Sequence, residues 1–272
     1  MAATQGLMAG KRGLIMGVAN NRSIAYSIAK ACADAGASVA LTYQGEQFKK
    51  RVEPLAAELG AIVAGHCDVT DMESLDSVFD FVAKEWGKLD FVVHAVAFSN
   101  KDELDGRYVE TSRDNFLMTM DISVYSFTAV AKRAEPLMTE GGSLLTLTYY
   151  GAEKVMPHYN VMGVAKAALE ASVRYLAVDL GGKNIRVNAI SAGPIKTLAA
   201  SGIGDFRYIL RWNEYNSPLK RNVSTEEVGN SGLYFVSDLS SGVTGEVHHV
   251  DSGYHVVGMK AGDAPDISVV KE

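Results

Sequence analysis

The sequence predicts an α/β fold in which helices cover both faces of one doubly wound, seven-stranded parallel sheet. The main observation is that short apolar runs, rich in β-branched residues, alternate along the chain with longer segments of helical spacing. These runs are apolar at consecutive positions, which is typical of strands that are buried on both faces. No Pro/Ser-rich linker, repeat or low-complexity stretch interrupts the alternation, so residues 1–272 are expected to form a single domain.

The alternation also gives expected boundaries for each element. Seven runs are expected to be strands: Gly13–Val18, Ser38–Tyr43, Ile62–Val69, Leu89–Phe98, Ser143–Tyr149, Arg186–Ser191 and Glu246–Val250. Six segments carry apolar residues at helical intervals and are expected to be helices: Ile24–Ala35, Glu46–Leu59, Met72–Trp86, Met120–Met138, Tyr159–Leu180 and Thr225–Val236.

One segment breaks the alternation. Residues 194–221 connect a strand to the next helix, and this length far exceeds the usual connection of about two to six residues. The segment is also apolar, and it leaves the carboxyl end of a strand, where open α/β sheets bind their ligands. We therefore expect a helical lid over a substrate. The alternative is a helical hairpin that packs on the core or on a partner subunit.

The charge balance limits the partners. The 26 Lys and Arg residues against 32 Asp and Glu residues give a net charge of −6, which disfavours binding to nucleic acid or to an anionic membrane surface. No apolar run reaches the roughly 18 residues of a transmembrane helix. Residues 1–10 lack the apolar stretch of a signal peptide, so the expected location is the cytoplasm.

The cysteines and histidines predict no metal site. The chain has two cysteines, Cys32 and Cys67, which are too few for a disulfide framework or a thiolate cluster. His248 and His249 are adjacent in an expected strand and therefore point to opposite faces. No His-x-x-x-His pair occurs.

The turn after the first expected strand is a candidate dinucleotide site. Gly17 allows a tight turn, and the small residues Ala19 and Ser23 allow close approach of a pyrophosphate at the N-terminus of a helix that begins at Ile24. Ser23 could instead act as the helix N-cap. The turn has fewer glycines than the usual dinucleotide-binding fingerprint. The assignment therefore depends on its position between the first expected strand and the first expected helix.

Residues at the ends of the next strands fit the rest of a dinucleotide. Gln44 follows the second strand, where such folds meet the adenosine ribose, and it carries no cation for a 2′-phosphate. Arg22 leaves NADPH open, although NADH is favoured. Asp68, before Val69, could accept the adenine amino group or cap the following helix. The small residues around Ala95 and Val96 let backbone lie along the cofactor.

Tyr159 and Lys166 form the candidate catalytic pair. They are separated by two helical turns, so both lie on one face of their expected helix. A cationic lysine beside a phenol favours the phenolate and strengthens the phenol as a proton donor.

At this point the sequence resembles the short-chain dehydrogenase/reductase family, whose fold is of the Rossmann type. The resemblance covers nearly the whole chain and rests on the tyrosine–lysine helix, on Asp68-Val69 and on the strand at 186–190. The chain departs from the family in two places. The glycine-rich turn is opened to Gly17-x5-Ser23, and Thr146 replaces the catalytic serine thirteen positions before Tyr159.

In these two departures the sequence resembles the enoyl-acyl-carrier-protein reductase branch of that family. The branch carries a second tyrosine before the catalytic one, here Tyr149, ten positions before Tyr159. The stretches at 159–163 and 191–199 also match it closely. The resemblance implies reduction of a trans-2-enoyl thioester on acyl-carrier protein by NADH, in bacterial fatty acid biosynthesis, by a homotetramer.

The resemblance also implies roles for individual residues. Tyr159 donates to the developing enolate, Lys166 holds the nicotinamide ribose, and Tyr149 orients the thioester. Ile195 and Thr197 close over the cofactor. The remaining substrate contacts are expected from Ser99, Met162, Ile203 and Phe206.

Two other functions remain open. A ketone or alcohol oxidoreductase of the same fold would need a hydroxyl beside Tyr159, which Thr146 could supply. A nucleotide-sensing protein without turnover would not need Tyr159 or Lys166, yet both are present.

Overall fold

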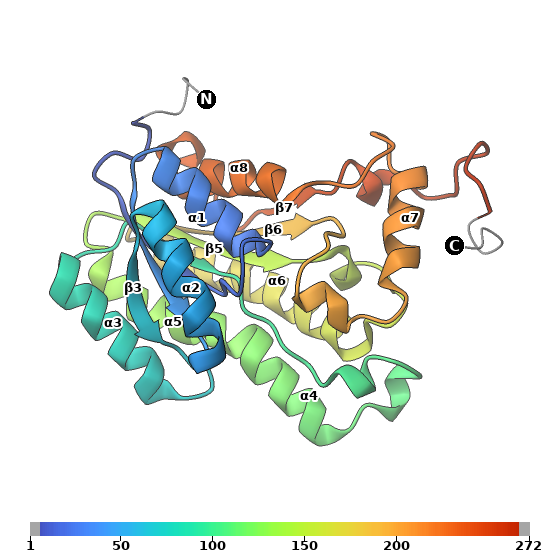
Figure 1. Cartoon of the computed structure of the whole chain (residues 1–272), viewed down its shortest axis with the longest axis horizontal. Coiled ribbons are helices and arrows are strands. Elements are labelled where there is room, and N and C mark those ends of the chain that lie inside the picture. Colours follow the sequence, from blue (N-terminus) through green and yellow to red (C-terminus); the bar gives the residue numbers. More distant parts are fainter. Residues whose placement is uncertain (1–5, 267–272) are drawn as a thin grey trace.

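The computed structural model describes residues 6–266 and contains one sheet of seven parallel strands in the order β3-β2-β1-β4-β5-β6-β7 (Figure 1). Fold class and strand number are therefore as the sequence predicts. The strands are β1 Arg12–Met16, β2 Ser38–Tyr43, β3 Ile62–His66, β4 Phe91–His94, β5 Gly142–Thr148, β6 Ile185–Ala192 and β7 Val247–Val250.

Helices form a layer on each face of the sheet. One face is covered by α1 (Ile24–Asp34), α2 (Glu46–Leu59) and α8 (Thr225–Val236), whose apolar residues pack in one core cluster. The other face is covered by α3 (Met72–Trp86), α5 (Ser126–Ala134) and α6 (Asn160–Gly181), which pack in a second cluster. The sheet is apolar on both sides because it separates these two cores.

The strand order reverses between β1 and β4. Strands β2 and β3 lie to one side of β1, whereas β4 to β7 lie to the other. In open α/β sheets the ligand binds at the carboxyl ends of the strands, at this reversal point. The turn that begins at Gly17 leaves β1 there, as the sequence analysis requires.

The expected helix Met120–Met138 is wrong in its start and its continuity. Helix α4 already begins at Arg113 and ends at Met120; a π-helical turn, Asp121–Tyr125, then leads into α5. Ser112 caps α4 by accepting from the backbone N–H of Asn115 at 3.1 Å. The first three residues of α4, Arg113 to Asn115, are polar, so the apolar pattern did not reveal where the helix begins. Pro136 lies in a 3-10 turn that follows α5.

Four expected strands are shorter than predicted: β1 and β7 by one residue each, and β3 and β4 by more. β3 ends at His66 instead of Val69, and β4 spans Phe91–His94 instead of Leu89–Phe98. Beyond His66 and His94 the chain leaves the ladder of paired strands and continues toward the candidate site. The remaining short turns are 3-10 helices at Lys101–Glu103, Tyr108–Glu110, Glu135–Leu137, Tyr150–Ala152, Ala199–Gly202, Asp238–Ser240 and Tyr254–Val256.

The long connection after β6 is mostly ordered as helix. It contains the 3-10 turn Ala199–Gly202 and helix α7, Phe206–Asn216. In Figure 1 α7 stands apart from both helical layers, on the side to which the arrow of β6 points. It is one α-helix preceded by a short turn, not a hairpin of two α-helices.

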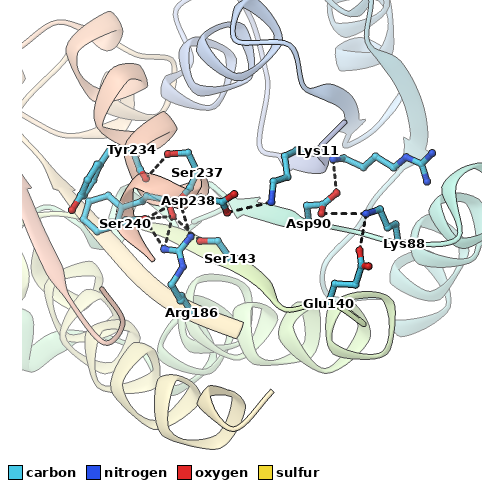
Figure 2. A network of polar contacts seen from close by, with 12 residues as sticks. Lys11, Lys88, Asp90, Glu140, Ser143, Arg186, Tyr234, Ser237, Asp238 and Ser240 are labelled. Carbon is cyan, nitrogen blue, oxygen red and sulfur yellow. Dashed lines mark hydrogen bonds and ion pairs between the residues drawn. The ribbon is translucent and has the colours of Figure 1, made fainter. Parts of the chain in front are cut away.

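The opposite end of the sheet is held by a polar network (Figure 2). The guanidinium of Arg186 donates to the carbonyl oxygens of Phe235 at 2.9 Å and Ser237 at 3.0 Å, at the C-terminus of α8. Ser143, its neighbour on β5, also donates to Phe235. A cation at a helix C-terminus is favoured by the helix dipole. This network anchors α8 to the amino ends of β5 and β6, away from the site.

No helix among residues 6–266 is long and apolar enough to span a membrane.

Candidate active site

The turn after β1 brings two backbone segments into contact. Gly17 has a φ of +95°, and a Cβ there would lie 2.1 Å from the carbonyl oxygen of Ala95, which follows β4. Only glycine fits both the conformation and the space. The small residues at Gly17 and Ala95 thus let the ends of β1 and β4 approach closely, where a dinucleotide would lie.

Ser23 organises this turn rather than capping the helix with its side chain. Its hydroxyl oxygen accepts from the backbone N–H groups of Ala19 at 3.0 Å and Asn20 at 3.1 Å. Within the described residues, the N–H groups of Ile24 and Ala25 at the start of α1 have no hydrogen-bond partner. Free N–H groups at a helix N-terminus are suited to an anion, so the turn fits a pyrophosphate.

Asp68 and Gln44, which follow β3 and β2, lie together where the sequence predicts the adenosine of a dinucleotide. Burial opposes ionisation of Asp68, but hydrogen bonds from the Thr70 backbone and hydroxyl and from the Gln44 side chain outweigh it and lower the pKa of Asp68. Asp68 is therefore a carboxylate. It does not cap α3, because Asp71 is the N-cap and accepts from the N–H of Glu73.

The other expected cofactor residues lie near these turns. Ala95 and Ile195 pack against the core cluster on the α1 face, and Val96 packs against the other cluster. The hydroxyl of Thr197 accepts from the N–H of Ala200 at 3.2 Å, which shapes the chain beyond β6.

Tyr159 and Tyr149 form an aromatic pair. Tyr159 is the N-cap of α6 and is only 8% exposed. The two rings meet edge to face, with centroids 5.1 Å apart. Burial, and then Tyr149 and Glu170, raise the pKa of Tyr159 well above the usual range of a phenol. Tyr159 is therefore a neutral phenol that can donate a proton.

Lys166 is buried two turns along α6, but its ammonium does not act as expected on Tyr159. Its Nζ donates to the carbonyl oxygen of Leu147 on β5, at 2.8 Å. Burial lowers the pKa of Lys166 to about 8, although Glu170 acts in the opposite direction. The prediction that the lysine favours the phenolate is thus wrong for the protein alone, because burial of the phenol dominates.

Thr146 is buried on β5, and its hydroxyl is engaged with His94 on the neighbouring strand β4. Its hydroxyl donates to the carbonyl oxygen of His94 at 3.0 Å and contacts the His94 ring at 3.2 Å. Burial lowers the pKa of His94 to about 3, so this ring is neutral, and it also contacts Ser126 at 2.8 Å. A hydroxyl held in this way is not available beside Tyr159, which removes the support for a ketone or alcohol oxidoreductase.

A cavity of about 180 Å³ lies between Tyr149 and helix α7. Its wall is largely aromatic and apolar. The lining includes Tyr149, Pro194, Tyr208, Ile209, Trp212 and Tyr254. The indole N–H of Trp212 donates to the hydroxyl of Tyr254 at 2.8 Å, which connects α7 to the 3-10 turn after β7.

Most of the expected substrate residues lie outside the wall of this cavity. Met162 is buried in the same core cluster as Tyr159, and Ile203 packs against that cluster. Phe206 begins α7. Ser99 is buried, and its hydroxyl is bonded to Thr119 at 2.9 Å and Asn115 at 3.3 Å. Of the expected substrate side chains, only Tyr149 is among the residues that line the cavity.

Sequence reasoning missed two glycines that shape the site. A Cβ on Gly151 would lie 2.4 Å from Cδ1 of Tyr159, so the phenol ring packs directly on this backbone. A Cβ on Gly163 would lie 2.8 Å from the carbonyl oxygen of Gly151. Gly163 follows Tyr159 by four positions, which is about one helical turn. A glycine at that spacing from a candidate tyrosine was the feature of the sequence that could have indicated its role.

Among the described residues, no group of His, Cys, Asp or Glu could hold a metal ion.

The fold and the site together define an oxidoreductase of the short-chain dehydrogenase/reductase class, with a glycine turn after β1 and, after β5, a helix that carries Lys166 and has Tyr159 as its N-cap. A family model described as enoyl-(acyl carrier protein) reductase matches residues 17–255. The chain therefore belongs to the enoyl-acyl-carrier-protein reductase family.

Relatives and solved structures support this assignment. The chain is 79% identical to enoyl-[acyl-carrier-protein] reductase [NADH] 1 of Rhizobium meliloti over the full length of both chains. It is 55% identical to the Rickettsia felis protein FabI, which bears the same NADH-dependent description, over 94% of this chain and 98% of that one. An Anaplasma phagocytophilum enoyl-acyl-carrier-protein reductase, solved with NAD, superposes with a TM-score of 0.92 at 64% identity, covering 97% of this chain and 98% of that one.

A second solved structure bears on the cofactor. The Bacillus cereus enoyl-acyl-carrier-protein reductase was solved with NADP+ and indole naphthyridinone. It superposes with a TM-score of 0.92 at 53% identity, covering 94% of this chain and all of that one.

Proposed function

We propose that this protein reduces the double bond of a trans-2-enoyl thioester carried on acyl-carrier protein, with NADH as the hydride donor, in bacterial fatty acid biosynthesis. One observation carries the proposal beyond the family assignment. The site pairs a buried, neutral Tyr159 with Tyr149, while the hydroxyl of Thr146 is engaged with His94. Two phenols without a neighbouring free hydroxyl suit a conjugated thioester better than a ketone.

The bound cofactor would supply a hydride to the β-carbon of the enoyl group. Negative charge then develops on the thioester oxygen, and a fixed donor at that position stabilises it. Tyr159 is that donor. Its neutral state means that it enters the reaction with its proton in place. Tyr149 contacts it edge to face and orients the thioester.

Lys166 holds the nicotinamide ribose. Its ammonium already has one hydrogen bond, to Leu147, and a lysine ammonium has three donors. The remaining donors are available for ribose hydroxyl groups. The N–H groups of Ile24 and Ala25 would receive the pyrophosphate, and Gln44 and Asp68 the adenosine.

The segment 194–221 acts as the substrate lid. Helix α7 supplies four residues to the wall of the cavity beside Tyr149, namely Tyr208, Ile209, Trp212 and Asn213. An apolar cavity of this kind suits part of an acyl chain. Ile203 and Phe206, at the start of the lid, would shelter the chain nearer to Tyr159.

The partner is acyl-carrier protein, and the working form is a homotetramer in the cytoplasm. Exposed apolar side chains on the outer face of α6 are consistent with burial between copies, since Tyr175 is 76% and Val178 is 82% exposed.

Steady-state turnover tests the proposal. NADH oxidation is followed at its absorbance maximum with a crotonyl thioester and, separately, with a ketone of similar size. We expect turnover of the thioester alone. Turnover of the ketone at a comparable kcat/KM would reject the enoyl assignment, and the same assay with NADPH measures cofactor preference.

A further inference from the structure

Three segments that are distant in sequence meet at His158, directly before Tyr159. The Nδ1 atom of His158 lies 2.6 Å from a carboxylate oxygen of Asp105, in the loop that follows β4. Its Nε2 atom lies 3.2 Å from a carboxylate oxygen of Asp205, the N-cap of lid helix α7. One imidazole therefore joins the lid and the loop at 105 to the chain next to the catalytic phenol.

The contact with the lid is close as well as polar. A Cβ on Gly204 would lie 3.1 Å from Cγ of His158, so the lid backbone packs on the imidazole ring. The hydrogen bond between His158 and Asp105 also contributes to lowering the pKa of Asp105, after the backbone N–H of Gly106. Both carboxylates are exposed, and the ring itself is largely covered.

The backbone at this junction is in an uncommon conformation. His158, Asn160 and Asp205 have positive φ values of 55°, 36° and 49°, which makes them three of the six such non-glycine residues in the described part of the chain. Residues in this region persist where the surroundings hold them, and they cluster at functional sites. The two residues that flank Tyr159 are both among them.

Asn160 ties the other flank of Tyr159 to the same loop. Its side-chain amide lies 3.3 Å from the carbonyl oxygen of Gly106 and 3.4 Å from those of Glu103 and Asp105. The loop at 103–106 thus holds the chain on both sides of Tyr159, and His158 extends this hold to the lid.

Both contacts of His158 are hydrogen bonds only when both ring nitrogens carry protons. An ionised carboxylate accepts but does not donate, and a neutral imidazole has a single N–H. Each carboxylate faces one ring nitrogen, so the imidazole can donate to Asp105 through Nδ1 or to Asp205 through Nε2.

We propose that His158 is a positioning residue that clasps the lid, through Asp205, to the turn that carries Tyr159. The inference rests on the proposed function, in which segment 194–221 covers the acyl chain. His158 does not touch the reacting atoms. Its effect is to favour the closed lid when substrate binds, so it acts on KM for the enoyl substrate more than on kcat.

The test is a double-mutant cycle on His158 and Asp205. Asparagine tolerates the left-handed backbone but is too short to replace the imidazole, so His158→Asn removes the clasp and keeps the turn. His158→Asn and Asp205→Asn should each raise KM for an enoyl thioester about threefold to tenfold, since the pair is partly exposed. The double variant should be no worse than His158→Asn alone, because that substitution already removes the contact with Asp205.

Two further variants separate positioning from general damage. Asp102→Asn removes an exposed carboxylate from the same loop and should leave KM and kcat unchanged. His158→Gln can still donate to one carboxylate, so its KM for the enoyl thioester should rise less than that of His158→Asn. Additive losses in the double variant, or a fall in kcat with unchanged KM, would overturn the proposal.

A second readout does not depend on turnover. Trp212 lies on α7, and the chain has one other tryptophan, Trp86, on α3. In a Trp86→Phe background, acrylamide quenching of Trp212 reports exposure of the lid. Quenching should increase in His158→Asn and Asp205→Asn but not in Asp102→Asn. Unchanged quenching in both variants would reject the clasp, whereas an inactive parent protein would reject the proposed function.

Discussion

The ring of Tyr159 packs on the backbone of Gly151. A Cβ at that glycine would lie 2.4 Å from Cδ1 and 2.7 Å from Cε1 of the tyrosine. Gly151 belongs to the 3-10 turn after β5, and Tyr159 is the N-cap of α6. The position of the phenol is thus defined by a residue that carries no chemical group of its own. The absence of a side chain there allows the edge-to-face contact between Tyr159 and Tyr149.

Gly151→Ala should displace the phenol and lower kcat. Misplacement of a catalytic group by about 1 Å can cost on the order of 10²-fold in rate. NADH binding should be retained, because the nucleotide turn lies elsewhere. Steady-state kinetics and a fluorescence titration with NADH measure the two effects. Gly182→Ala is the matched control, since a Cβ at Gly182 meets nothing within 4 Å; equal losses in both variants would contradict the steric argument.

Tyr159→Phe should bind NADH normally and lose most turnover. The substitution removes only the hydroxyl that we propose as the donor to the enolate, and loss of such a donor typically costs about 10²–10³ in rate. Stopped-flow measurement of NADH oxidation with a crotonyl thioester checks the size of the effect. Near-normal turnover would assign the donor to Tyr149 instead.

NADH affinity should fall as pH rises through about 8. Burial disfavours the charged form of Lys166 and lowers its pKa to about 8, so the free protein carries the ammonium below that pH and a neutral amine above it. The dissociation constant for NADH, measured by fluorescence between pH 6.5 and 9.5, should therefore increase at the alkaline end. Lys166→Ala should bind NADH more weakly than Tyr159→Phe at neutral pH, and its pH dependence should be flat. A pH dependence that survives in Lys166→Ala would assign it to another group.

NADH should have the higher kcat/KM of the two nicotinamide cofactors. Gln44 provides no cation for a 2′-phosphate, and hydrogen bonds keep Asp68 ionised beside it. A 2′-phosphate near this carboxylate is repelled. Asp68→Asn should therefore narrow the difference between NADH and NADPH. A preference for NADPH in the unmodified protein would assign recognition of the phosphate to a cation such as Arg22.

Charge reversal on the lid should affect the carrier-bound substrate selectively. Residues 194–221 contain five basic and two acidic residues, whereas the chain as a whole has a net charge of −6. A basic rim at the mouth of the site would attract an acidic carrier protein. Arg207→Glu with Arg211→Glu should raise KM for an enoyl-carrier protein, most at low salt, and hardly change KM for a short thioester.

Lys84→Glu controls for a general change of charge. Lys84 is exposed on α3, on the far side of the molecule from α7 (Figure 1). The Lys84→Glu substitution should leave KM unchanged for both the enoyl-carrier protein and the short thioester. Equal losses on both substrates in the lid variant would mean that the two arginines support the structure of the lid.

The sequence alone determined the features that depend on short-range pattern. Consecutive apolar residues predicted the seven buried strands, because a parallel sheet covered on both faces needs them. The spacing of Tyr159 and Lys166 predicted both for one helix, because helical geometry is local, and the structure places Lys166 in α6 and Tyr159 at its N-cap. Gly17 predicted a tight turn, which the structure confirms with a φ of +95°.

Only the tertiary structure decided which groups are available to react. Thr146 stands at the position expected of a catalytic hydroxyl, yet it donates to His94, which is 52 residues away in the sequence. The pKa values of Tyr159 and Lys166 depend on burial by segments far along the chain, so their spacing could not predict them. His158 likewise acquires its two carboxylate partners only when the loop at 105 and the lid fold against it. Local pattern specifies the elements, whereas desolvation and long-range hydrogen bonds, which arise when the elements pack, specify the chemistry.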